Sequence, residues 1–175
     1  MKIGLGADPF GLELKETVKQ HLMAQGHACV DIGGTATEER PYYEVAHELA
    51  GKVSSGEYDR GILVCGTGMG MSIVANKHPN VYAAVCADPS TAVKARSINN
   101  ANVLTMGGMV TAPYKAKEIV DTFLATEFKS GWDPDIQAFL DRSLGEIHRI
   151  ESQEFADSKP NRGKSGRGAP GSDRG

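Results

Sequence analysis

The sequence has no long apolar run, no leader-like start and no clustered metal ligands. Its apolar segments are far shorter than the roughly 18 residues that a membrane-spanning helix needs, so no membrane partner is expected. The chain opens directly on the strand-like MKIGLGAD, without the basic stretch and apolar core of a secretion signal. It contains no CxxC pair or His/Cys cluster, which argues against structural zinc, so no metal is expected.

Cysteine is scarce. The chain has three cysteines, Cys29, Cys65 and Cys86, and each lies among apolar or strand-like residues. An odd number in this setting predicts reduced thiols in a cytoplasmic protein rather than a disulfide framework.

The net charge of −3 hides an uneven distribution. Residues 159–175 carry five basic side chains and one acidic, whereas residues 1–158 carry fourteen basic and twenty-one acidic. The end of the chain is rich in Gly, Pro, Ser and Arg and has too few apolar residues to offset the entropy of ordering. We therefore predict a single domain over residues 1–150 and a mostly disordered tail over residues 151–175. A short solvated tail explains its basic charge, so no nucleic-acid partner is expected.

Short apolar runs alternate with longer amphipathic patterns along the chain. The strand-like runs are KIGLGAD, ACVDIG, RGILVCG, VYAAVC and NVLTMGG. Helices are expected over residues 11–25, 42–55, 71–77, 89–98 and 113–126. This alternation predicts an α/β fold with a doubly wound parallel sheet of about five strands. Ligands bind such sheets at the carboxyl ends of the strands, which directs attention to Asp8, Gly33, Cys65–Gly70, Asp88 and Gly107.

One further helix is expected after the sheet is complete, over residues 132–155. Its apolar positions are Ile136, Phe139, Leu140, Leu144 and Ile147. A terminal amphipathic helix needs a surface to cover, either on its own domain or on a second subunit. Of the two, we favour a homodimer.

A dense group of glycines follows the third strand-like run, in GILVCGTGMGMSIVANK. Gly66, Gly68 and Gly70 let the backbone turn sharply after Cys65 and point successive N–H groups inward. Such a nest favours an anion (phosphate, carboxylate or an enediolate oxygen) and a thiolate over a thiol. Thr67 adds a hydroxyl within reach of a ligand. The alternative is a glycine turn beside a buried cysteine, and the loop alone does not decide between them.

The segment CGTGMGMSIVANK resembles the signature loop of the ribose-5-phosphate isomerase B and galactose-6-phosphate isomerase family, which is close to C-G-T-G-x-G-x-S-I-x-A-N-K. The resemblance extends over residues 1–128, through an aspartate turn after the first strand, Pro41 and Tyr43, and Gly107-Gly108. It implies a Rossmann-like α/β/α sandwich that dimerises and uses neither metal nor cofactor.

The resemblance also implies an activity, the aldose–ketose isomerisation of a small sugar phosphate through an enediol. Cys65 matches the family's base, Thr67 stands beside it as a further catalytic candidate, and the loop N–H groups match the oxyanion cradle. The expected substrate-binding residues are Asp8, Pro9, Gly66, Gly68, Met69, Gly70, Asn99 and Arg40. The alternative for Asp8 is a turn-former ahead of a helix, and for Asn99 it is a helix C-cap.

Two departures from the family pattern concern histidines. Pro9 follows Asp8 where the family has histidine, and Ile98 replaces the histidine that opens the sugar ring. An isoleucine cannot donate a proton. A four-carbon sugar 4-phosphate cannot close a five-membered ring through its phosphorylated oxygen, so we expect this substrate first and ribose 5-phosphate second.

Other departures concern arginines that would bind phosphate. Met109 replaces the arginine of Gly-Ala-Arg, and the family's arginine pair in the last helix falls near Trp132 and Ile136. Arg40, Arg142 and Arg149 are candidate replacements. The missing charges also leave open an unphosphorylated or differently charged sugar.

Two other classes of function remain. Gly4, Gly6 and Gly11 with Asp31 resemble a dinucleotide fingerprint, but the spacing is G-x-G-x4-G and Asp8-Pro9 interrupts it. The other is an inactive partner subunit of a mixed dimer, an arrangement that the resemblance to two-subunit galactose-6-phosphate isomerases allows.

Overall fold

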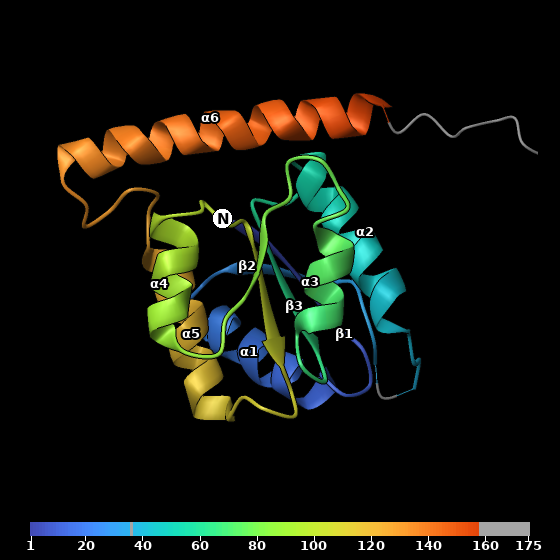
Figure 1. Ribbon diagram of the computed structural model, residues 1–175. Helices are drawn as coiled ribbons and strands as arrows, with labels where there is room; N and C mark the ends of the chain where they lie inside the picture. The colour runs from blue at the N-terminus through green and yellow to red at the C-terminus, as the bar shows by residue number, and fades with distance from the viewer. Residues whose placement is uncertain (36, 158–175) are drawn as a thin grey trace, which may run out of the picture.

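Five parallel strands form the centre of the molecule (Figure 1), of which the computed structural model describes residues 1–35 and 37–157. The strands are β1 (Lys2–Ala7), β2 (Ala28–Asp31), β3 (Arg60–Cys65), β4 (Ala83–Val85) and β5 (Val103–Gly107). They lie in the order β2-β1-β3-β5-β4, and every pairing is parallel. The inner strands β1, β3 and β5 are almost wholly buried, which explains their continuous apolar runs. The predicted sheet is confirmed.

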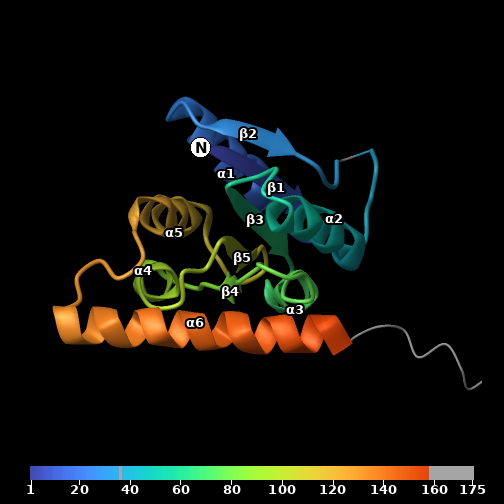
Figure 2. The ribbon, with the colours of Figure 1, turned by 90° about the horizontal axis from the view of Figure 1, so that it is seen from above.

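A helix follows each strand and covers one of the two faces of the sheet. These helices are α1 (Leu12–Ala24), α2 (Tyr42–Ser54), α3 (Met69–Ala75), α4 (Pro89–Ser97) and α5 (Pro113–Ala125). α1, α4 and α5 share one core cluster with the sheet, in which Val18, Ala95 and Phe123 are buried. α2 and α3 share the other cluster, through Leu49 and Met71 (Figure 2). This is the α/β/α sandwich that was expected.

The carboxyl ends of the inner strands meet at one edge of the sheet. Cys65 is the last residue of β3 and is in register with Gly107, the last residue of β5. Ala7, which ends β1, is in register with Val64. The loops that follow β1, β3 and β5 therefore start side by side, as the parallel topology predicts.

Helix α6 (Pro134–Asp157) lies on the amino-end side of the domain, alongside the β4 border of the sheet (Figures 1 and 2). The Lys129 ammonium contacts Asp141 of α6 at 2.8 Å. The Glu151 carboxylate accepts hydrogen bonds from the Asn80 N–H at 2.8 Å and the Tyr82 hydroxyl at 3.1 Å. Few polar contacts thus attach the helix, together with Leu140, which is buried.

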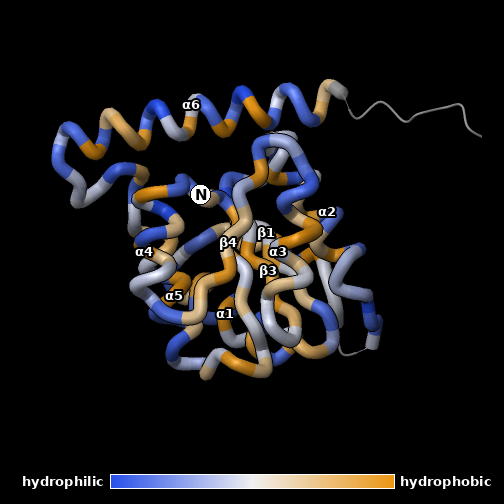
Figure 3. The backbone as a smooth tube through the Cα atoms, in the orientation of Figure 1, coloured by the Kyte–Doolittle hydropathy of each residue, from blue (hydrophilic) through white to orange (hydrophobic). Residues whose placement is uncertain are grey.

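Five large apolar side chains of α6 are exposed: Ile136, Phe139, Ile147, Ile150 and Phe155. Apolar residues recur along the helix in Figure 3. Because this spacing continues with no glycine or proline after Gly145, the helix runs on to Asp157. Residues 151–157, which fall in the expected tail, are helical and continue the helix expected over residues 132–155. Residues 158–175 of the expected tail lie outside the described residues. None of the described helices is long and apolar enough to span a membrane.

Candidate active site at the carboxyl ends of the strands

Cys65 occupies the end of β3 and is 5% exposed. Its Sγ accepts a hydrogen bond from the Gly68 N–H at 3.1 Å. Gly68 has a φ of +80°, and a Cβ there would lie 3.0 Å from the Met106 backbone carbonyl carbon, so the position requires glycine. The loop therefore turns back on its own cysteine and directs a backbone donor at the sulfur.

The turn after β5 lies directly against the cysteine loop. The Gly108 N–H donates to the Cys65 carbonyl at 2.7 Å, and the Met109 N–H donates to the Gly66 carbonyl at 3.0 Å. A Cβ at Gly107 would come within 2.8 Å of the Thr67 Cα, so this close approach also depends on glycine. The two loops form one rigid backbone unit around the cysteine.

Asp8 lies on the other side of Cys65, in the turn after β1. Its backbone N–H donates to the Val64 carbonyl at 3.2 Å, and its carboxylate accepts the Gly11 N–H at 3.0 Å. Burial raises the pKa of Asp8 above its ordinary value, although hydrogen bonds from the Gly11 and Phe10 N–H groups act to lower it. Pro9, next to Asp8, is exposed. Asp8 both shapes this turn and lies at the edge of the site, so the two expectations for it are compatible.

The rim of the site is apolar. Phe10 is 65% exposed and Met109 66% exposed, and both lie against Gly66. Met69, the first residue of α3, is exposed as well. Position 109 therefore does border the cysteine loop, and it presents a thioether there rather than a cation.

Tyr42 is a site residue that the sequence did not single out. Its ring lies over Gly70, where a Cβ would come within 2.8 Å of the tyrosine Cε2. Tyr43, which carried the resemblance, packs edge-on against Tyr42 with ring centroids 5.4 Å apart. Thr67 is exposed, and its hydroxyl accepts the Met69 N–H at 3.4 Å. The available signal for Tyr42 in the sequence was its place after Pro41 at the start of a predicted helix.

Arg40 lies in a hollow at the end of β2 and is already engaged. It donates to the Ile32 carbonyl at 2.7 Å and to the Glu48 carboxylate at 2.9 Å. Asp31, in the same hollow, is bound by the ammonium groups of Lys15 and Lys19. A dinucleotide site would use Asp31 for a ribose hydroxyl, but here the carboxylate neutralises a buried lysine.

Asn99 is not brought together with Cys65 within one chain. Helix α4 starts after β4, at the Asp88 capping box, and runs back toward the amino ends of the strands before Ile98 closes it. Asn99 follows the helix, is exposed, and lines a groove between α4 and the edge of β4, with Cys86 and Lys94. The alternative role of Asn99, as the C-cap of this helix, is taken by Ile98.

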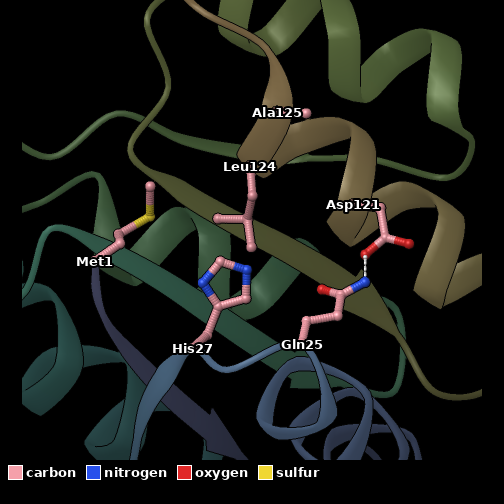
Figure 4. A pocket seen from close by; sticks show the side chains of 6 residues that line it. All are labelled: Met1, Gln25, His27, Asp121, Leu124 and Ala125. Atoms are coloured by element: carbon pink, nitrogen blue, oxygen red, sulfur yellow. Dashed lines mark hydrogen bonds between the residues drawn. The ribbon is translucent and has the colours of Figure 1, made fainter.

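A separate hollow opens at the amino ends of the strands (Figure 4). It is lined by Met1, Gln25, His27, Asp121, Leu124 and Ala125. The Gln25 amide donates to Asp121 at 2.9 Å, and His21 contacts the same carboxylate at 2.7 Å. Among the described residues, no three His, Cys, Asp or Glu side chains are grouped as metal ligands, here or at Cys65.

Comparison with known proteins identifies the architecture around Cys65. Residues 3–137 match the ribose/galactose isomerase family. The chain belongs to this family. The solved ribose-5-phosphate isomerase B of Clostridium thermocellum superposes with a TM-score of 0.80 and 39% identity, covering 88% of this chain and 99% of that one.

Two curated relatives of this ribose/galactose isomerase act on four-carbon sugars, by their names. The 4-deoxy-4-sulfo-D-erythrose isomerase of Clostridium sp. (strain MSTE9) is 44% identical over 152 residues, which cover 86% of this chain and 96% of the relative. The D-erythrulose-4-phosphate isomerase of Pectobacterium atrosepticum is 42% identical over 132 residues, 75% of this chain and 87% of the relative. The chain is a sugar isomerase of the ribose-5-phosphate isomerase B type, and its reaction is aldose–ketose isomerisation.

Proposed function

We propose that this isomerase acts on a four-carbon sugar that carries an anionic group, a sulfonate or a phosphate, on C4. The observation that carries the proposal is an intact cysteine loop combined with apolar residues at positions 98 and 109. Cys65 with its Gly68 donor suits proton transfer. Ile98 and Met109 supply neither a proton for a ring oxygen nor a charge for a phosphate. The two four-carbon relatives support the same substrate length.

Cys65 acts as the general base of an enediol mechanism. Its thiolate removes the proton from the carbon next to the carbonyl, and the thiol returns it to the neighbouring carbon, so the sugar neither gains nor loses atoms. Negative charge that gathers on oxygen is stabilised by the N–H groups of residues 66–70. Thr67 donates its exposed hydroxyl to a substrate oxygen. Asp8 accepts from a substrate hydroxyl at the edge of the site.

The sugar needs no ring-opening step. In a 4-phosphate the oxygen on C4 is esterified, and in a 4-deoxy-4-sulfo sugar C4 carries sulfur in place of that oxygen. Neither can close a five-membered ring through C4, so the carbonyl is available directly. Loss of a proton donor at Ile98 then costs such a substrate nothing.

The anionic group is held by Arg142 of a second subunit. Arg40 is bound by Glu48, and Arg149 donates to Glu146 and Gln153 on its own helix. Within the described ranges, no hydrogen bond or ion pair holds Arg142, which lines an open groove on α6. An unengaged guanidinium is the group best able to take a sulfonate or phosphate in a bidentate contact.

A homodimer completes this site. The exposed apolar side chains of α6 need a covering surface, and Asn99 lies away from Cys65 in the same chain. A twofold-related copy would cover the exposed face of α6 and would bring its own Asn99 to the Cys65 site of the first subunit. In such a dimer each subunit contributes the same surface patch to its partner. Light scattering at micromolar concentration is expected to give twice the monomer mass, and a monomer would contradict the two-chain site. Turnover only with a co-purifying related chain would indicate the mixed-dimer alternative.

The location we propose is the cytoplasm. Cys29, Cys65 and Cys86 are all free, and free thiols persist in a reducing compartment. Recovery of the native protein in a periplasmic or secreted fraction with oxidised cysteines would contradict this.

A panel of sugars tests the substrate. The panel contains 4-deoxy-4-sulfo-erythrose, erythrose 4-phosphate, unsubstituted erythrose and ribose 5-phosphate, each assayed for aldose–ketose conversion. We expect an anionic four-carbon sugar to give the highest kcat/KM, and Ile98→His to help ribose 5-phosphate more than erythrose 4-phosphate. Equal or better turnover of ribose 5-phosphate by the native chain would contradict the claim that Ile98 disfavours sugars that need ring opening. If the chain converts unsubstituted erythrose alone, the proposed requirement for an anionic group on C4 is contradicted.

A further inference from the structure

The second half of the CGTGMGMSIVANK segment takes no part in the chemistry above. Asn76, near its end, follows the last residue of α3. Its side-chain Nδ2 donates to the Ala83 carbonyl at 2.9 Å, and its Oδ1 accepts the Ala83 N–H at 2.8 Å. One side-chain amide thus bonds both backbone groups of a residue in β4, as a neighbouring strand would.

Ser72 converges on the same residue from one turn earlier in α3. Its hydroxyl donates to the Ala83 carbonyl at 3.2 Å. The Asn76 Nδ2 also donates to the Ser72 carbonyl at 3.0 Å, which fixes the amide orientation. The two polar side chains of the segment therefore attach the end of α3 to a single point on the sheet.

Helix α3 connects this point with the catalytic sulfur. The Ser72 N–H donates to the Gly68 carbonyl at 3.1 Å, and the Asn76 N–H donates to the Ser72 carbonyl at 3.1 Å. Residues 68, 72 and 76 are four apart, so they share one face of the helix. At the start of that face, the Gly68 N–H donates to the Cys65 Sγ at 3.1 Å.

We infer that Asn76, assisted by Ser72, is a positioning residue for Cys65. A helix of seven residues is too short to hold its own shape in water, so contacts with the sheet set its orientation. Asn76 fixes one end of α3 on β4, and the fixed helix keeps the Gly68 N–H directed at the sulfur. The inference rests on the proposed proton transfer at Cys65, because displacements of about 1 Å at a reacting group reduce turnover strongly.

Asn102 provides a matched control. Its Oδ1 accepts the Tyr82 N–H at 2.8 Å and its Nδ2 donates to the Asn80 carbonyl at 2.7 Å, so it makes the same two kinds of bond, but to two different residues. These bonds hold the turn before β4 rather than α3. Asn76→Asp and Asn102→Asp each keep the acceptor, lose the donor and set a carboxylate against a backbone carbonyl.

We expect Asn76→Asp to lower kcat about tenfold or more while KM stays within about threefold, since positioning acts on the chemical step. Asn102→Asp should keep kcat within about threefold, with a similar loss of thermal stability. Ser72→Ala should also lower kcat, but by a smaller factor. If Asn76→Asp does not fold, the Ser72 variant tests the positioning role in its place. An equal fall in kcat for the Asn102 variant, or an unchanged kcat in both α3 variants, would overturn the inference.

Hydrogen exchange at the Gly68 amide gives a readout that needs no substrate. Exchange should be about tenfold faster in Asn76→Asp than in the native chain or in Asn102→Asp, because the N–H···S bond opens more often. If the native chain converts no sugar in the panel, the proposed function fails while this measurement still decides the positioning role. Equal exchange rates in all three proteins would overturn it.

Discussion

The two ends of the sheet differ in how far a single chain completes them. At the carboxyl ends, Cys65, Asp8 and the turn after β5 are joined by backbone hydrogen bonds within one chain. At the amino ends, α6 rests on a few polar contacts and leaves apolar residues such as Phe139 and Ile147 exposed. The proposed base and its cradle thus lie within one chain, whereas the proposed contacts of Asn99 and Arg142 with the sugar require a second copy.

Removing the proposed base, Cys65, at the carboxyl ends of the strands should have the largest effect on turnover. Cys65→Ala is expected to lower kcat by about 10² to 10⁴-fold, the usual contribution of a general base, while the fold stays intact. The measurement is steady-state turnover with the best sugar of the panel. Cys29→Ala, at a half-buried thiol on the edge strand, is the matched control and should keep full activity. If Cys65→Ala keeps more than about a tenth of the native rate, Cys65 is not the base.

Mixing two inactivated variants tests whether Asn99 of one subunit acts at the Cys65 site of the other. Asn99→Ala should lower kcat/KM about tenfold by removing a substrate hydrogen bond. When this variant exchanges subunits with Cys65→Ala, half of the dimers are mixed and each has one fully native site. About a quarter of the native activity should then return, because the twofold interface is isologous. No recovery beyond the average of the two separate preparations would show that Asn99 does not act across an interface.

Restoring a charge at the rim should have a smaller effect. Met109→Arg adds a guanidinium beside Gly66, where a phosphate dianion gains more from it than a sulfonate monoanion. We expect kcat/KM for erythrose 4-phosphate to rise about threefold to tenfold relative to the sulfonate sugar. Met23→Arg, at an exposed residue near the end of α1 and away from the cysteine loop, adds the same charge and should change the ratio less. A ratio that moves equally in both variants would indicate general electrostatic attraction only.

The weakest effect on turnover is expected for a substitution at the end of β2. The ion pairs there stabilise the fold but do not contact the proposed active site. Burial alone would raise the pKa of Asp31, but hydrogen bonds from Lys15 and Lys19 hold it below its ordinary value of 3.8. The native state therefore binds fewer protons than the unfolded chain near that pH, so this contribution is present above about pH 4 and is lost as the pH falls through the lowered pKa.

Asp31→Asn should lower the free energy of unfolding by about 3 kcal/mol at pH 7, because Lys15 is left buried with its charge poorly compensated. Between pH 5 and 3 its stability should depend less on pH than that of the native chain, measured by urea midpoints, with kcat unchanged. Glu38→Gln, at an exposed loop carboxylate, serves as the control. A native-like slope in the Asp31 variant would contradict the assignment.

Much of the carboxyl end was predictable because it depends on local signals. The continuous apolar run before Cys65 indicated a buried parallel strand, and the glycines after it indicated a backbone turn that only glycine permits. Helix α3 starts at Met69, two residues earlier than the expected start, because left-handed Gly68 serves directly as its N-cap. The helix at 89–98 was also foreseen, whereas Asp88, expected as a candidate ligand-binding residue, caps that helix.

What escaped prediction depends on contacts between distant segments. Asn99 lies away from Cys65 because α4 runs opposite to the strands, which a motif match does not reveal. The Arg40 guanidinium is already paired with the Glu48 carboxylate, which lies on the following helix α2. It is therefore not available to bind a substrate anion as expected. Tyr42 reaches Gly70 only after α2 and α3 have packed together on the same face. Each case is decided by tertiary geometry rather than by residue type.

The bonds between Asn76 and Ala83 have a consequence for solubility as well. Strand β4 is short and lies at the border of the sheet, where unpaired backbone groups can recruit a strand from another molecule. The asparagine amide bonds the N–H and C=O of Ala83, the first residue of that strand, and so occupies two backbone groups that another strand would otherwise pair with. The side chain that we infer to position Cys65 thereby also leaves fewer backbone groups open for pairing at the border of the sheet.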